Sequence, residues 1–147
     1  MRYIYCLAAF ALIGCGRPEQ ANQAVITVDA ALAPYLARFT QDIGVSSDGI
    51  SASLVDLNAA TAGECIKQAD GSKQIQINIT WWSNADDDGK EQLMFHELGH
   101  CAMGLQHVAD VDSNGCPISI MYPYVFGNTL CYTGNKHYYF RELASHD

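Results

Sequence analysis

The chain has 147 residues, 49% of them apolar, which suits one hydrophobic core and one domain rather than several. Its formal net charge of −8 argues against nucleic-acid binding, which depends on cationic side chains that neutralise phosphates. Beyond the N-terminus no apolar run reaches the roughly 18 residues of a membrane-spanning helix, so we expect no such helix there.

The N-terminal sequence MRYIYCLAAFALIGCG is typical of a secretory signal peptide, with an early arginine, a short apolar run and small residues near its end. Its segment LIGC, which ends at Cys15, resembles the lipobox of bacterial lipoproteins, whose cysteine becomes the lipidated first residue of the mature chain. The alternative is an ordinary signal peptide that happens to contain this cysteine. The resemblance implies a signal peptide over residues 1–14, a tether over 15–23 and a single domain over 24–147. The protein would then be an exported envelope lipoprotein, held to a membrane by lipid at Cys15 on the periplasmic or cell-surface side.

The first elements expected after the tether are a short strand and a helix. Residues 24–28 (AVITV) form a short β-like apolar run. Asp29 is a candidate cap for the following helix, Pro34 must lie near its start, and Gly44 is a natural end. Apolar residues then recur at helical spacing: Leu32, Leu36, Phe39 and Ile43.

Two further strands and two further helices are expected along the chain. Residues 50–57 (ISASLVDL) are compatible with a strand, and residues 74–82 (QIQINITWW) alternate apolar and polar side chains, as a half-buried strand does. Asp88, with Glu91 three residues later, resembles the capping box at the start of a helix. The chain is loop-like from Gly104 to about Gly134, and Asn135 is positioned to cap a short final helix.

The stretch HELGHCAMGLQH, which begins at His96, has the pattern of a metal site. Residues four apart project from one face of an α-helix, so His96 and His100 could bind one ion. Glu97 lies between the histidine face and the apolar face, where it could act as a base without being a ligand. A left-handed glycine at Gly104 would end the helix and allow His107 to return to the metal.

HExxH, then Gly-x-x-His, then the segment SIMYP around Met121, together resemble the metzincin clan of zinc endopeptidases, and the matrixins in the Met-turn-like segment. The resemblance implies that one catalytic zinc ion is held by His96, His100 and His107. Glu97 would be the general base and acid in peptide hydrolysis by a zinc-activated water. Met121 would support the site without binding the metal.

The same resemblance implies an α+β, zincin-like fold. A twisted mixed sheet with an antiparallel edge strand would pack on the zinc-binding helix, followed by the Met-turn and a C-terminal helix. The strand over residues 74–80 would be the sheet edge that pairs with an extended peptide or protein substrate. Residues after Met121 would wall the pocket for the side chain that follows the scissile bond. Tyr122 and Tyr124 could stabilise the oxyanion, or they could simply pack there.

One residue more than the clan pattern HExxHxxGxxH separates His100 from Gly104. On an α-helix an extra residue rotates the exit by about 100° and lengthens the helix by about 1.5 Å. His107 remains the expected third ligand, because the Gly-x-x-His spacing is intact. The alternatives for that position are acidic residues further along the chain, namely Asp110, Asp112 and Glu142.

Four cysteines remain once Cys6 and Cys15 are set aside, and in an exported domain they suggest two disulfides with three possible connectivities. Cys116 and Cys131 flank the segment around Met121 and could clamp it as a loop. That leaves Cys65 to pair with Cys101. The alternative is four free, buried thiols.

A second cation is a weaker possibility. Asp110, Asp112 and Asn114 alternate before a glycine, as in the first half of a calcium-binding loop. An EF-hand is excluded, because its twelfth position would be Met121. A polar loop without calcium is the alternative.

The sequence therefore predicts a monomeric, lipid-anchored zinc endopeptidase. The alternative is a non-catalytic envelope lipoprotein with structural zinc, or a binding module that has lost protease activity. Glu97 argues against the alternative, because a structural zinc site fills its fourth position with a side chain and needs no base.

Overall fold

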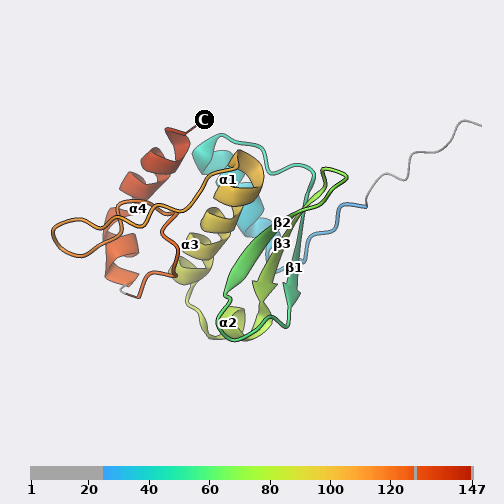
Figure 1. The fold of residues 1–147 in the computed structure, drawn as a ribbon, viewed down its shortest axis with the longest axis horizontal. Coiled ribbons are helices and arrows are strands. Elements are labelled where there is room, and N and C mark those ends of the chain that lie inside the picture. The colour runs from blue at the N-terminus through green and yellow to red at the C-terminus, as the bar shows by residue number, and fades with distance from the viewer. Residues whose placement is uncertain (1–24, 128, 147) are drawn as a thin grey trace, which may run out of the picture.

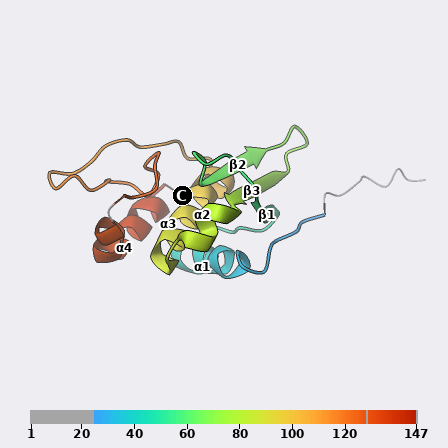
Figure 2. The ribbon, with the colours of Figure 1, turned by 90° about the horizontal axis from the view of Figure 1, so that it is seen from below.

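The computed structural model describes residues 25–127 and 129–146 as an α+β domain in which helices pack beside a three-stranded sheet (Figures 1 and 2). The predicted signal peptide (1–14), the whole predicted tether (15–23) with Cys15, and the first residue of the predicted domain, Ala24, lie outside the described residues. Within the described part, none of the helices has the length and apolar character needed to cross a membrane.

Helix α1 (Ala33–Ile43) follows its prediction closely, apart from the cap. Its four predicted apolar positions are buried, Pro34 lies in the first turn, and Gly44 ends the helix in the left-handed conformation at φ 85°. The prediction of Asp29 as a side-chain cap is wrong, since no side chain caps this helix. The Asp29 carboxylate instead accepts the backbone N–H of Leu54 at 2.7 Å, so it holds the chain against the sheet.

The segment before α1 is not the strand that residues 24–28 suggested. Val28 forms a single parallel bridge with Ala52, and hydrogen bonds join Asp29 N–H to Ala52 O and Ala52 N–H to Thr27 O. Val25 is 82% exposed. The apolar run therefore covers part of one sheet edge without becoming a strand.

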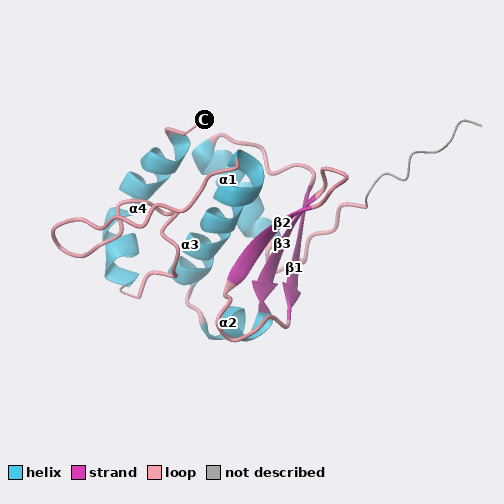
Figure 3. Cartoon of the chain, viewed as in Figure 1, coloured by secondary structure: helices cyan, strands magenta, loops and turns pink. Residues whose placement is uncertain are grey.

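The sheet contains β1 (Ile50–Val55), β2 (Gly63–Lys67) and β3 (Lys73–Asn78) in the order β1-β3-β2 (Figure 3). β1 is parallel to β3 and β2 is antiparallel to it, which confirms a mixed sheet with an antiparallel edge strand. The expectation that residues 74–80 form the sheet edge is wrong, because β3 has a neighbour on each side. β2 is the antiparallel edge strand instead.

The predicted strand over residues 74–82 ends four residues early. Asn78 Oδ1 accepts the N–H groups of Thr80 and Trp81 and thereby caps a new helix, α2 (Ile79–Asn84). Ile79 is consequently exposed, whereas Ile75 and Ile77 are fully buried. A local side-chain cap has overridden the alternating pattern.

Helix α3 (Asp87–Leu98) runs through the centre of the helical layer and carries His96 and Glu97, the first two residues of the HExxH motif (Figure 1). Its cap is Asp86, whose Oδ1 accepts Gly89 N–H at 2.8 Å, so the prediction of Asp88 as N-cap is wrong. Asp88 instead pairs with Lys136 at 2.7 Å. The Phe95 ring contacts Phe39 of α1 and Phe140, which places the core between the helices.

Helix α4 (Thr129–Ala144) covers α3 and bends at Asn135, where φ is −130°. The second half starts where the final helix was expected. Buried Glu91 of α3 lies 2.6 Å from Arg38 of α1 and 2.6 Å from Lys136 of α4. Tyr132 O–H also donates to it at 3.0 Å. These contacts to buried Glu91 fix α3 between its two neighbours.

Candidate metal centre

The helix that carries HExxH changes character directly after α3. Residues Gly99–Met103 form a π-helical turn, η1, and Gly104 ends it with φ 75°. Leu105 N–H donates to Gly99 O at 3.0 Å, which closes the turn across Gly104. A π turn joins residues five apart instead of four, so it contains one residue more than an α-helical turn. The additional residue before Gly104 is accommodated there.

The chain then returns with His107 to the two helical histidines. The Nε2 atoms of His96 and His100 are 3.1 Å apart, and those of His107 lie 3.0 Å from His100 and 3.2 Å from His96. Among the described residues this is the one group of three or more His, Cys, Asp or Glu side chains that could hold a metal ion. The rival ligands Asp110, Asp112 and Glu142 are not part of it.

The hydrogen bonds of the imidazoles show that this cluster suits a cation. His96 Nδ1 lies 2.9 Å from Ile120 O, and His100 Nδ1 lies 2.7 Å from Leu105 O. Because a carbonyl oxygen only accepts, both Nδ1 atoms carry the hydrogen and both Nε2 atoms present lone pairs. Two lone pairs that face each other repel unless a cation lies between them. Metal-binding histidines commonly donate their other N–H to a carbonyl in this way.

Burial keeps the helical histidines in the neutral form that binds metals. Removal from water lowers the pKa of His96 to about 4 and also lowers the pKa of His100. Imidazole nitrogen is a ligand that zinc, copper, iron and nickel all accept, so the donor set alone defines a metal site without fixing the metal.

Glu97 lies in the same cleft as the three histidines, 3% exposed and without a hydrogen bond or ion pair among the described residues. Burial, with a smaller contribution from the charge of Glu64, raises the pKa of Glu97 to about 8. The opposite charge of a bound cation would lower this pKa. Gly63 provides the space, because a Cβ at that position would lie 3.0 Å from Glu97 Oε1.

Met121 lies beneath the helix at the histidine end. It is 1% exposed, and a Cβ added at Gly99 would lie only 2.4 Å from its Sδ atom. Its carbonyl accepts Val108 N–H at 3.0 Å, so the segment that follows His107 is attached to the same turn. The predicted supporting methionine is therefore in contact with the helix and bonded to the returning loop.

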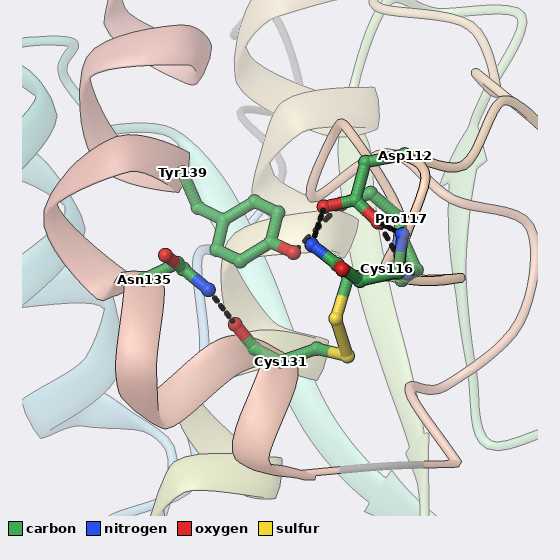
Figure 4. Close-up of a disulfide and its surroundings, with 7 residues drawn as sticks. Asp112, Cys116, Pro117, Cys131, Asn135 and Tyr139 are labelled. Carbon is green, nitrogen blue, oxygen red and sulfur yellow. Dashed lines mark hydrogen bonds between the residues drawn. A yellow bond between two sulfur atoms is a disulfide. The ribbon is translucent and has the colours of Figure 1, made fainter.

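Two disulfides are present, at the pairs that the cysteine spacing favoured. Cys65–Cys101 joins β2 to the π turn, and Cys116–Cys131 joins the loop before Met121 to α4 (Figure 4). Tyr139 O–H donates to Pro117 O at 2.7 Å beside the second disulfide. The π turn that carries His100 and the loop before Met121 are thus each covalently attached to another part of the domain.

The acidic loop over residues 110–115 is explained by its own backbone. Asp112 Oδ1 accepts N–H groups of Asn114 at 2.8 Å and Cys116 at 2.9 Å, and these bonds lower the pKa of Asp112. The carboxylate closes a turn, as the polar-loop alternative required, and Asp110 forms no metal-binding group with it among the described residues.

The cleft around the histidines has a volume of about 610 Å³. Tyr122, half-buried, and Tyr124, 71% exposed, line it as predicted for pocket residues. Edge strand β2 forms another wall, with Glu64 and Lys67 among its lining residues. This strand was not predicted from the sequence, because residues 63–67 (GECIK) do not alternate apolar and polar side chains. The only indication that it lies near the site was Cys65, which was expected to pair with Cys101.

No protein-family model matches this chain, and neither a curated protein nor a solved structure is significantly similar to it. What the fold and the site define is a disulfide-bonded α+β domain with a three-histidine group able to hold a metal ion. The geometry of the cleft is therefore the basis for a proposed function.

Proposed function

We propose that the chain is a zinc-dependent endopeptidase with a zincin-like fold of the metzincin type. The observation that carries the proposal is one cleft that contains three converging Nε2 atoms and a buried carboxyl group, Glu97, with no partner among the described residues. His96, His100 and His107 would hold the metal. Three protein ligands leave a position open, which is the arrangement of catalytic rather than structural zinc.

A bound zinc ion would supply a Lewis acid that polarises a carbonyl and makes water more acidic. Glu97 would remove a proton from water in the cleft and deliver it to the leaving amine, which is the role of a general base and acid. Its position supports this role, because Glu97 lies in the cleft with the histidines and makes no hydrogen bond to another described residue, which leaves its oxygens available to water.

The substrate would bind in an extended conformation along β2. This strand pairs with β3 on one side only, and its other edge borders the cleft. Backbone N–H and C=O groups on such an edge can pair with a peptide and hold the scissile bond near the histidines. Tyr122 and Tyr124 remain candidates for contact with the oxyanion, with packing as the alternative.

We further propose that the domain is exported and anchored to the cell envelope by lipid at Cys15. The two disulfides support export, because such bonds persist in oxidising compartments. Mass spectrometry of the membrane fraction tests the anchor, since a lipidated Cys15 adds the mass of its acyl chains and a Cys15→Ala variant cannot.

Cleavage of a peptide library, with and without chelator, tests the enzymatic proposal. We expect cleavage by the zinc-loaded protein, loss of cleavage with chelator and recovery when zinc is restored. Stable binding of zinc without cleavage of any library member would favour the non-catalytic alternative.

A further inference from the structure

A second cavity, of about 750 Å³, lies beside the metal cleft. Gln92 and Val125 line both hollows, so these two residues form the boundary between them. Gln92 precedes His96 by four residues on α3, which places it one helical turn before the histidine on the same face. A substrate bound at the histidines could therefore place one side chain in this cavity.

The walls of this side cavity combine apolar surface with negative charge. The apolar part includes Leu57, Trp81, Val125, Phe126 and Tyr132. Three carboxylates also line it, from Asp56, Asp86 and Asp88, whereas no Lys, Arg or His is among its described lining residues. Lys136 neutralises Asp88, but Asp56 and Asp86 have no cationic partner among the described residues. The cavity is thus negative overall.

Gln92 supplies an independent indication of the ligand. The residue is 2% exposed, and its Oε1 atom has no hydrogen-bond partner among the described residues. A buried acceptor without a donor is costly, so such groups are rarely left unpaired. A ligand that donates a hydrogen bond would satisfy this oxygen, and a cation would also complement the carboxylates.

The orientation of β2 indicates which substrate residue reaches the cavity, if the proposed endopeptidase function is correct. The start of the strand, Gly63, lies against Glu97, and its end, Lys67, lies near Gly104. A peptide antiparallel to β2 would run from the Lys67 end towards the Gly63 end. Beyond Gly63 lies the connection to β1, where Ala59 lines the side cavity. In such an antiparallel peptide, the side that follows the scissile bond is therefore directed towards the cavity.

We propose that the side cavity is a specificity pocket for a lysine or arginine that follows the scissile bond. The aliphatic stem would pack on Trp81 and Phe126, as basic side chains do on apolar and aromatic surfaces. The charged end would lie near the carboxylates of Asp56 and Asp86, which have no cationic partner among the described residues, and donate to Gln92 Oε1. This inference rests on the proposed function for its substrate, but the cation-binding property of the cavity does not.

The binding test uses small probes and the full chain without added metal. Pentylammonium, pentanol and pentanoate are titrated while NMR follows the Trp81 indole and the Gln92 side-chain amide. We expect pentylammonium to bind most tightly and Asp56→Lys to weaken it about fivefold, near the upper end for an exposed charge pair. Asp48→Lys, an exposed change in the turn before β1, is the control and should bind like wild type. Equal binding of pentanol, or no effect of Asp56→Lys, overturns the proposal.

The cleavage test compares peptides that differ only in the residue after the scissile bond. We expect the zinc-loaded chain to cleave the Lys peptide with a kcat/KM at least about tenfold above that for the Glu peptide. Asp56→Lys should reduce the value for Lys and leave that for Leu unchanged. Equal cleavage of the Lys, Glu and Leu peptides overturns the proposal of a specificity pocket. Selective binding of pentylammonium by a chain that cleaves no peptide overturns the endopeptidase and leaves the cation pocket standing.

Discussion

Replacement of Gly99 by alanine tests whether Met121 is held against the metal-site helix. Gly99 is the first residue of the π turn, directly before His100. The new Cβ would lie 2.4 Å from Met121 Sδ and 3.2 Å from its Cε. Because Met121 is 1% exposed, the displaced side chain has no open space to enter. The methionine or the helix must move.

The expected effect is a loss of stability from two opposed contributions. Alanine is favoured over glycine within a helix by about 0.5–1 kcal/mol. Overpacking of a dense core costs about 1–3 kcal/mol, and a contact this short belongs at the upper end. The net change is a loss of about 1–2 kcal/mol in the free energy of unfolding.

Urea denaturation of wild type and Gly99→Ala measures this loss. Gly134→Ala is the matched control, because it also lies in a helix but its Cβ would meet nothing within 4 Å. That variant should be as stable as wild type or slightly more stable. In a Met121→Ala background the cost of Gly99→Ala should disappear, since the clashing atoms are gone. A Gly99→Ala protein as stable as the Gly134→Ala protein would refute the reasoning.

Three further predictions concern ligation, the disulfide and the buried charges. His107→Ala should retain far less zinc in metal analysis after dialysis, because two imidazoles remain where three converge. Replacement of Cys65 and Cys101 by alanine should lower the free energy of unfolding by about 3–4 kcal/mol, since this bond closes a sequence separation of 36 residues. Lys136→Met should cost about 1–3 kcal/mol at pH 7, measured by urea denaturation, because buried Glu91 and half-buried Asp88 lose a donor. The Lys136 hydrogen bond lowers the pKa of Asp88, so its contribution is complete above about pH 4 and is lost as pH falls through the lowered pKa.

Each of these results has an outcome that would contradict it. His137→Ala, outside the cluster, should retain zinc like wild type, and equal retention by His107→Ala would remove His107 from the ligand set. A variant without the Cys65–Cys101 bond that keeps wild-type stability would show that this bond contributes little. A Lys136→Met deficit that stays constant from pH 7 to pH 2 would contradict the ion pair with Asp88.

The features that the sequence predicted well are those set by local chemistry. The His96–His100 spacing depends only on helical periodicity, and Gly104 ends the helix because glycine adopts positive φ without strain. The same holds for Gly44 at the end of α1. The cysteine pairing also followed from sequence position, because Cys116 and Cys131 flank the Met121 segment and only Cys65 and Cys101 then remain.

The features that it missed depend on competition between local signals or on partners distant in the chain. The alternating pattern around β3 continued past Asn78, yet the cap formed by that side chain started a helix. β2 owes its position to pairing with β3 and to the Cys65 disulfide rather than to its own pattern. The π turn accommodates the extra residue before Gly104, and no residue type in the sequence predicts such a turn. Asp88 resembled a cap but is held by Lys136, 48 residues away.

The central claim is that the three-histidine site is catalytic and that Glu97 is its base. Peptide cleavage by wild type and Glu97→Gln, each measured at equal zinc content, tests it most directly. Glutamine keeps the shape of the side chain but cannot accept the proton, so we expect full zinc binding and a loss of activity of about 10²-fold or more. Undiminished cleavage by Glu97→Gln would contradict the account.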